Sequence, residues 1–524
     1  MSARQQRRVL GVPYLLLLIL LAHAAWGVIY SVTVPPWEAH DEWGHYSFVR
    51  YLARERHLPP PGTKVIDKGD ESHQPPLYYA LIGLAMGWYN ANDGVQPAYN
   101  PYSATEGGSG GANIMVHDPA VEAFPYRGTI LALHTARLVS VVLSTLGLLA
   151  TYGMGRVLFF ERPDLALGAV SVNAFWPQYL FVGSVVTNDI MVTVCTSWFL
   201  FFLVHLLGER PRLRDWMGVG LLLSGALLSK NNALALVPVA AVGSVVALVR
   251  MIRTNGPTIR SLRGVLVLVA ALISTAGWWY ARNVLLYGGV FGRYTGRALP
   301  FFDLLARPAR HLRCLHWEQL PAMVRYGFIT FWASFGWGNV GLVEGIYVVA
   351  GIVCVLGMGG LVCFLVRKRT QRTEFLMLGF AVVCIVIVPL YLNLRQGSPY
   401  LRGRLCMPII APVSLLLTAG WAGLLPPRQA RWVLGPMSAA MALGAGLLPF
   451  RVIGPTYARP PQLTARDIQA ISHPLNYTFG AGIQLIGYDL NQWRVKSGET
   501  LPVTLYWRAL ARMEENYTLS VKVI

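Results

Sequence analysis

A cluster of titratable side chains follows the first apolar run of this 524-residue chain. It lies in the stretch PPWEAHDEWGHYSFVRYL, which begins at Pro35, and consists of Glu38, His40, Asp41, Glu42 and His45. A carboxylate beside a membrane can act as a general base toward an acceptor hydroxyl. Asp41 and Glu42 can instead cap the helix predicted to follow and complement its dipole. We treat both residues as catalytic candidates, with helix capping as the alternative.

The histidines of this cluster raise a second interpretation, a metal site. His40 and His45 are five residues apart, so they do not form the H-E-x-x-H pattern of a zinc protease. Glu42 with His45 or His73 stays as a candidate ligand set for a divalent cation. No other cofactor is predicted.

Further polar side chains interrupt or end later apolar runs. The stretch SVVTNDIMV supplies Asn188 and Asp189. The stretches LLSKNNALA, WWYARNVLLYGG and RQGSPYLRGRLCMP supply the cations Lys230, Arg282, Arg395, Arg402 and Arg404. Each has a plain explanation. Asn188 can cap a helix that has Asp189 in its first turn, and the cations can anchor helices in the membrane. Their predicted gathering on one membrane face beside two acidic sites indicates an anionic ligand, and phosphate suits arginine and lysine.

The composition defines the class of protein that carries these residues. Hydrophobic residues make up 54% of the chain and charged residues only 13%. Apolar runs of membrane-spanning length recur, which indicates a polytopic α-helical membrane protein. We expect about eleven spans, at roughly 10–33, 127–153, 165–186, 188–207, 216–230, 232–250, 264–286, 344–366, 374–394, 407–425 and 432–452.

The formal net charge of +19 does not indicate nucleic-acid binding, because the basic residues cluster in short segments between the apolar runs. By the positive-inside rule these segments are cytoplasmic, as is the N-terminus. The predicted location is the cell membrane, with outer loops at 34–126 and 287–343 and an extracytoplasmic C-terminus. Residues 1–453 then form the transmembrane domain and residues 454–524 a second domain.

The first outer loop is expected to contain two juxtamembrane helices. One begins near Asp41, where apolar residues recur at every third position, and should lie in the membrane interface. The other begins at Pro75 and Pro76, which suit a first helical turn. The Gly-, Asn- and Ser-rich stretch from about Asn90 to Phe124 is predicted to be a mobile insertion.

The C-terminal residues change to a period of two. The runs IQLIGYDL, TLPVTLYWRAL and YTLSVKVI predict three antiparallel strands of a β-sandwich-like domain. Because the chain stops at Ile524 inside such a run, and three strands make a poor independent domain, we expect this domain to be truncated.

Together these features resemble a family. The acidic pair after the first span, the QPPLYY helix start, TND, LLSK and GWWYARN are similar to the GT-C membrane glycosyltransferases. The resemblance is to the protein O-mannosyltransferase and aminoarabinose transferase group, glycosyltransferase family 39, and covers about residues 10–450. It implies a sugar donor carried on a polyprenyl phosphate and a lipid, glycan or protein acceptor on the extracytoplasmic face of a bacterial inner or plasma membrane.

Carried over to this chain, the resemblance assigns Asp41 as the catalytic acidic residue, with Glu42 beside it and Asp189 as the second-loop acid. The residues that it implies for substrate or phosphate binding are His73, Gln74, Asn188, Lys230, Arg282 and Arg404. Relatives often carry QGRY before the tenth span, whereas this chain has RQGSPYLRGRLCMP, so Arg395 competes with Arg404 for that role.

The predicted chemistry is a direct displacement. Polyprenyl phosphate leaves without protonation, so the enzyme needs cations for the developing phosphate charge and one base for the acceptor. Such a displacement inverts the anomeric carbon and needs no glycosyl-enzyme. The alternatives are a transporter or flippase of a lipid-linked or anionic solute and a scaffold for the outer β-domain; the absence of a clear internal repeat disfavours the transporter.

Overall fold

A computed structural model of the chain describes residues 3–86, 93–100, 103, 112–208, 211–256, 259–290, 314–367, 371–458, 462–480, 482–490, 494, 496, 501 and 503–511. The chain divides into two compact units, Met1–Tyr457 and Ala458–Ile524. Residues 90–92, 101–102 and 104–111 of the predicted mobile insertion lie outside the described residues, as do the strand predicted for YTLSVKVI and residues 291–313 of the second outer loop.

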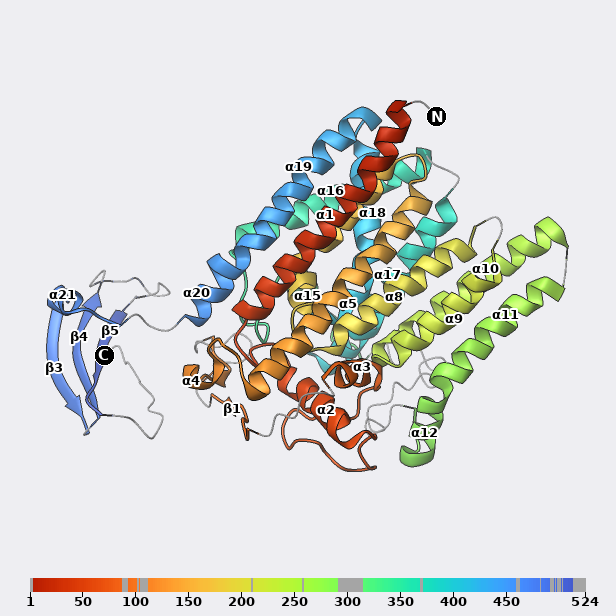
Figure 1. The fold of residues 1–524 in the computed structure, drawn as a ribbon. Helices are drawn as coiled ribbons and strands as arrows, with labels where there is room; N and C mark the ends of the chain where they lie inside the picture. Colours follow the sequence, from red (N-terminus) through yellow and green to blue (C-terminus); the bar gives the residue numbers. More distant parts are fainter. Residues whose placement is uncertain are drawn as a thin grey trace. The chain divides into compact units, whose positions relative to one another are not determined.

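The larger unit is built from helices (Figure 1). Its first part contains α1 (Ala3–Thr33), α2 (Glu42–Glu55), α3 (Leu77–Met86), α4 (Pro119–Glu122), α5 (Gly128–Leu158), α6 (Pro163–Ala174), α7 (Pro177–Val182), α8 (Asn188–Leu206) and α9 (Leu213–Leu227). Its second part contains η1 (Asn231–Leu236), α10 (Val237–Asn255), α11 (Ile259–Leu272), η2 (Ile273–Gly277), α12 (Trp278–Tyr287), η4 (Trp317–Gln319), α15 (Leu320–Trp332), α16 (Glu344–Arg367), α17 (Arg372–Gln396), η5 (Gly403–Ile409), α18 (Ile410–Leu424), α19 (Pro427–Leu448), η6 (Pro449–Ile453) and α20 (Gly454–Tyr457).

Nine helices in the described part of the chain are long and apolar enough to cross a membrane, which confirms the polytopic helical fold. Each matches one of the eleven predicted spans. The predicted span at 165–186 is instead divided into α6 and α7, because Pro177 cannot continue a helix and begins a new one. The span predicted at 216–230 is α9, whose 15 residues cover only about 22 Å at a rise of 1.5 Å per residue.

The elements that follow α1 gather at one end of the helix bundle. Figure 1 shows α2, α3 and α4 there, with the short strand β1 (Ala98–Tyr99), which pairs with β2 (Met115–Val116). Both helices predicted in the first outer loop are present. The prediction that α2 lies in the membrane interface is wrong for its first two turns, because residues 42–49 are all buried inside the protein.

Glycines allow α16 and α18 to pack closely. A Cβ atom on Gly420 would collide with the carbonyl oxygen of Gly357, and one on Gly360 would collide with that of Gly420. Small residues at a helix interface permit such an approach of two backbones inside a membrane. Since α18 directly continues η5, this packing fixes the position of Arg404 in η5.

The smaller unit contains α21 (Ala465–Gln469) and an antiparallel sheet of β3 (His473–Phe479), β4 (Ile483–Leu490) and β5 (Val503–Ala509), in that order. In the register of this sheet Tyr488 pairs with both His473 and Leu505. Two of the predicted strands, IQLIGYDL and TLPVTLYWRAL, correspond to β4 and β5. Sequence reasoning missed β3, whose Pro474 and Asn476 weaken the strand pattern.

The close helix crossing gives the first testable prediction. Gly420→Ala should lower the melting temperature of the detergent-solubilised protein, because the added methyl group must push α16 and α18 apart, at a cost of about 1 to 3 kcal/mol. Gly359→Ala is the matched control, since a Cβ at Gly359 meets no atom within 4 Å. Equal melting temperatures for the two variants would contradict the packing.

Candidate active site

A buried ion pair joins the start of α2 to the middle of the bundle. Arg137 of α5 donates from Nε to Glu42 Oε1 at 2.8 Å and from Nη2 to Glu42 Oε2 at 2.6 Å. Both side chains are 0% exposed. A buried charge is tolerated only when it is paired and its remaining hydrogen-bonding groups are satisfied.

The backbone around this pair supplies the remaining hydrogen bonds. The amide groups of Trp37 and Val186 donate to the Glu42 carboxylate, at 3.1 and 3.0 Å. The guanidinium of Arg137 donates to the carbonyl oxygens of Ser31, Val34 and Pro35, at 2.7, 2.7 and 3.0 Å. The pair therefore ties together the end of α1, the turn before α2, α5 and the segment before α8.

Asp41 occupies the N-cap position of α2 without capping it. Its side chain makes no capping hydrogen bond, and its backbone is left-handed with a φ of 61°. Trp37, in the same turn, also has a positive φ, of 68°. Such conformations are uncommon outside glycine and persist where surrounding contacts hold them, often at functional sites. The capping interpretation of Asp41 does not describe this geometry.

The Asp41 carboxylate is held through one of its two oxygens. His40 Nδ1 donates to Oδ2 at 2.7 Å, and Arg404 Nη2 donates to the same oxygen at 3.0 Å. No described residue forms a hydrogen bond with Oδ1, and 27% of the side chain is exposed. Asp41 therefore presents one anchored oxygen and one open oxygen.

The pKa of Asp41 reflects these contacts. Burial alone would raise it, but the His40 hydrogen bond and the charge of Arg404 hold the pKa well below its usual value. Burial and the nearby charge of Arg404 lower the pKa of His40 to about 4, despite the opposing effect of Asp41. At neutral pH the carboxylate is therefore ionised and His40 is neutral, so the stabilising charge is that of Arg404.

A second carboxylate lies on the other side of Arg404. Asp189 Oδ1 accepts from Lys230 Nζ at 2.6 Å, and Asp189 Oδ2 is 3.8 Å from Arg404 Nη1. The N-cap of α8 is Thr187, whose hydroxyl accepts from the backbone N–H of Asp189. Neither Asn188 nor Asp189 therefore caps this helix. Two cations and two carboxylates thus alternate in one network that carries no net charge.

Two further predicted residues, Gln74 and Asn188, lie close together. Asn188 Nδ2 donates to the carbonyl of Ser229 at 3.0 Å and lies 3.5 Å from Gln74 Oε1. Gln74 in turn donates to Glu71 Oε2 at 3.0 Å. These contacts connect the turn before α3 with the start of α8. Arg395, the competitor of Arg404, is exposed at the end of α17.

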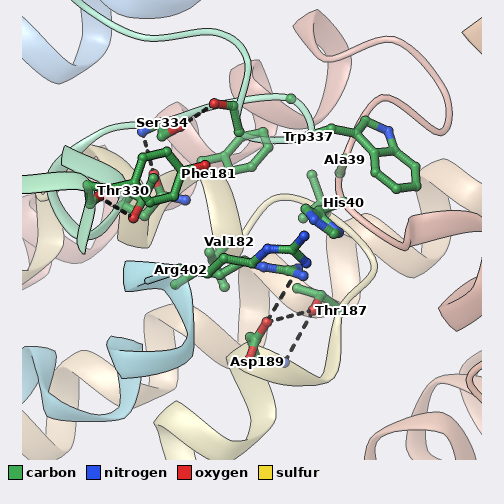
Figure 2. Close-up of a pocket in the computed structure, with 16 residues that line it drawn as sticks. Ala39, His40, Phe181, Val182, Thr187, Asp189, Thr330, Ser334, Trp337 and Arg402 are labelled. Atoms are coloured by element: carbon green, nitrogen blue, oxygen red, sulfur yellow. Dashed lines mark hydrogen bonds and ion pairs between the residues drawn. The ribbon is translucent and has the colours of Figure 1, made fainter. Parts of the chain in front are cut away.

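A cavity lies next to the two side chains that bind Asp41. His40 and Arg404, the two partners of Asp41, both line it, and so does Asp189. Figure 2 shows His40 and Trp337 on one side of the cavity, with Thr330 and Ser334 across from them. Arg404 Nε is buried there without a hydrogen-bond partner among the described residues.

Arg282 and His73 line a second, smaller cavity. The Arg282 guanidinium lies over the rings of Trp279 and Tyr287, 5.3 and 5.9 Å from their centroids. No described carboxylate pairs with Arg282, and none of the described residues that line the cavity is acidic. Trp279, which is 3% exposed, also lines it and keeps its buried Nε1 without a described partner.

Three residues of this region, His40, Arg137 and Glu71, were not assigned a role from the sequence; for His40 the available signal was its place beside Asp41. Arg137 is a lone charge in the apolar run LALHTARLVSVVL, which was the available signal. Glu71 lies just before QPPLYY; burial raises its pKa, and the negative charge of Asp41 adds to this effect while His45 opposes it. Nothing in the local pattern of ESHQPP marked Glu71 as part of the site.

The described residues do not form the metal site considered for Glu42, His45 and His73. No three His, Cys, Asp or Glu side chains come together as metal ligands in the described ranges. Both oxygens of Glu42 bind Arg137, and His45 Nδ1 is 2.8 Å from the Tyr79 hydroxyl. His73 lies 3.9 Å from Glu71 instead of beside Glu42.

Part of the chain matches a known protein family. Residues 132–279 match the family model described as dolichyl-phosphate-mannose-protein mannosyltransferase. The match confirms the resemblance to membrane glycosyltransferases. It covers less than half of the chain and contains Arg137, Asp189 and Lys230 but not Asp41. No curated protein matches the chain. The transporter alternative gains no support.

Solved structures give weaker likenesses. ArnT from Cupriavidus metallidurans bound to undecaprenyl phosphate is 14% identical, with a TM-score of 0.42 over 82% of this chain and 64% of that one. Arabinofuranosyltransferase AftD from Mycobacteria is 12% identical, with a TM-score of 0.44 over 84% and 27%. The oligosaccharyltransferase AglB from Archaeoglobus fulgidus, in complex with an inhibitory peptide and a dolichol-phosphate, is 14% identical, with a TM-score of 0.41 over 86% and 57%. The chain spans less than two thirds of each, and at these scores no residue is carried over.

The buried pair gives the second prediction. Arg137→Met should destabilise the protein by about 3 to 5 kcal/mol, because it leaves the Glu42 charge buried without its partner. Arg325→Met is the matched control: its pair with Glu344 is 68% and 73% exposed, and such pairs contribute less than about 1 kcal/mol. Unfolding in detergent measures both changes. Similar stability of the two variants would show that Glu42 does not depend on Arg137.

Proposed function

We propose that this chain is a membrane glycosyltransferase that moves a sugar from a polyprenyl-phosphate donor to an acceptor hydroxyl. The observation that carries the proposal is the Asp41 carboxylate, ionised, anchored through Oδ2 and open at Oδ1 beside a cavity. The family match over residues 132–279 supports the same class of enzyme.

In this mechanism Asp41 Oδ1 accepts the proton of the acceptor hydroxyl. The acceptor oxygen forms a bond to the anomeric carbon while the bond from that carbon to the phosphate oxygen breaks, and the electron pair leaves with the phosphate. The carbon is attacked from the face opposite the phosphate, so its configuration inverts. A general base must lie within hydrogen-bond reach of the proton it takes, and Oδ1 of the partly exposed Asp41 side chain is proposed to meet that condition.

The donor phosphate fits the second cavity better than the network around Asp41. The charges of Lys230 and Arg404 are already matched by Asp189 and Asp41, so an added anion gains little there. Arg282 has no described carboxylate partner, and the buried Trp279 Nε1 offers a second donor. Charge-assisted hydrogen bonds from arginine are suited to a phosphate.

The remaining candidates take supporting roles. Glu42 is proposed to be structural, because both of its oxygens bind Arg137. Asp189 and Lys230 are proposed to orient Arg404, and Gln74 and Asn188 to connect the turn before α3 with α8. The acceptor is proposed to be a lipid, glycan or protein hydroxyl.

We also infer the orientation of the chain from its charges. The short Arg-rich loops are placed in the cytoplasm by the positive-inside rule. The turn that carries Asp41 lies at the end of α1, one crossing away from the N-terminus. The site then faces the extracytoplasmic side of the membrane, where a lipid-linked sugar presents its head group.

The third prediction tests the base. Asp41→Asn preserves size but removes the basic oxygen, so transfer from a polyprenyl-phosphate sugar in detergent or vesicles should fall by about 100-fold or more. The melting temperature should stay near that of the wild type.

Asp118→Asn is the matched control, because the exposed Asp118 side chain caps α4 and lies outside the cavity beside Asp41. Its turnover should be unchanged. Near-normal turnover by Asp41→Asn would overturn the assignment and direct attention to Asp189 or Glu71.

The fourth prediction tests the phosphate site. Arg282→Met should raise the KM for the donor and the inhibition constant of undecaprenyl phosphate by about 10-fold or more, since hydrogen bonds to charged groups contribute roughly 1.5 to 3 kcal/mol.

Arg50→Met is its control, because Arg50 also lies over a ring, that of Trp43 at 5.4 Å, but does not line the cavity. Both constants should be unchanged in that variant. If Arg282→Met behaves in the same way as Arg50→Met, Arg282 only anchors α12.

A further inference from the structure

We propose that His40 is a positioning residue in two respects. Its Nδ1–H fixes the Asp41 carboxylate so that only Oδ1 is open to an acceptor. Its ring packs between the cavity wall and that carboxylate. The catalytic consequence rests on the proposed glycosyl transfer. The geometric claim, that His40 fixes the carboxylate, is independent of it.

The hydrogen bond itself defines the orientation. His40 Nδ1 and Asp41 Oδ2 are 2.7 Å apart, and Oδ2 also accepts from Arg404 at 3.0 Å. A neutral imidazole carries one N–H, and its carboxylate neighbour requires that hydrogen on Nδ1. With two donors converging on Oδ2, rotation of the carboxylate about its bond to Cβ would break both hydrogen bonds.

The imidazole cannot turn away, because its other surface is packed. The His40 and Trp337 rings stack with their centroids 4.8 Å apart and an interplanar angle of 30°. Figure 2 shows the two side chains next to each other in the wall of the cavity. Trp337 is held in turn by a hydrogen bond from its Nε1 to the Trp37 carbonyl at 3.2 Å. Trp37 belongs to the same positive-φ turn as Asp41. Contacts therefore run from Asp41 through His40, Trp337 and Trp37 back to the turn that carries Asp41.

The backbone of the turn does not orient the Asp41 side chain by itself. With a φ of 61° and no capping hydrogen bond, the Asp41 side chain gains no orientation from α2. Its direction depends on His40 and Arg404. Arg404 Nη1 is also 3.8 Å from Asp189 Oδ2, so a shift of Arg404 toward Asp189 would leave His40 as the remaining anchor.

Two substitutions separate the hydrogen bond from the packing. His40→Phe keeps a ring for Trp337 but loses the donor, whereas His40→Asn places an amide N–H near the Nδ1 position. In His40→Phe we expect kcat to fall roughly 10- to 100-fold, because a misoriented base loses reactive geometry, with KM for the donor little changed. His40→Asn should recover most of that loss.

The pH dependence supplies a readout that packing alone would not move. The charged or titratable groups around Asp41 are His40, His45, Glu71, Asp189, Lys230, Arg402 and Arg404. A hydrogen bond to the ionised carboxylate lowers its pKa, so losing that bond raises it. The acid limb of the rate profile should move to higher pH by about one unit or more in His40→Phe, and return toward the wild-type position in His40→Asn.

A second measurement needs no sugar donor. Difference infrared spectra between each protein and its Asp41→Asn derivative isolate the Asp41 carboxylate band, whose titration gives the pKa directly. This titration should show the same rise in His40→Phe and the same return in His40→Asn. His57→Phe is the control, because His57 is exposed beyond α2 and should change neither the band nor the rate.

The outcomes are distinct. An Asp41 band that titrates identically in wild type and His40→Phe would overturn the proposal, as would a folded His40→Asn protein that behaves like His40→Phe in both readouts. Absence of transfer by the wild type with any polyprenyl-phosphate sugar would instead overturn the proposed function, while the infrared titration still decides the role of His40.

Discussion

The buried contact between Glu42 and Arg137 is the constraint on which the rest of the site depends. Two opposite charges lie away from water, and backbone groups from the ends of α1 and from the segments before α2 and α8 satisfy them. A charged pair this deep is stable only if every remaining donor and acceptor is used. Because the partners come from four separate segments, the pair determines where the turn that carries Asp41 can lie.

Asp41 is adjacent to Glu42 in sequence but has the opposite environment. One carboxylate is buried and bound through both oxygens, whereas the other is bound through a single oxygen and is 27% exposed. The left-handed turn separates the two side chains, since it directs Asp41 away from the helix it would otherwise cap. Two neighbouring carboxylates can then serve different purposes, one holding the backbone and one remaining open for chemistry.

Charge balance distinguishes the two cavities in the same way. Around Asp41 the cations Lys230 and Arg404 alternate with carboxylates, so the network is near neutrality and can orient groups without attracting a strong anion. In the other cavity Arg282 lies against aromatic rings and has no carboxylate partner in the described part of the chain. Arginine over an aromatic face keeps its donors available for a bidentate ligand. The difference favours phosphate binding at Arg282 and hydroxyl activation at Asp41.

The sequence alone determined the class of this protein, because apolar runs and Arg-rich loops are local properties of the chain. Nine of the predicted spans, the helices after Asp41 and Pro76, and two strands could be read from periodicity. The pairs Asp41 with Arg404 and Asp189 with Lys230 could be predicted only as members of a shared site, since no local pattern states which carboxylate meets which cation.

Only the tertiary structure decided the roles within the site. Residues 95 positions apart form the pair of Glu42 with Arg137, and in this contact both carboxylate oxygens of Glu42 are already bound. The same folding placed Arg404 beside Asp41 and left Arg395 exposed, although both lie in one short segment of the sequence. The function of a charged side chain depends on which partner neutralises it, and in a helical membrane protein that partner is set by the packing of distant helices.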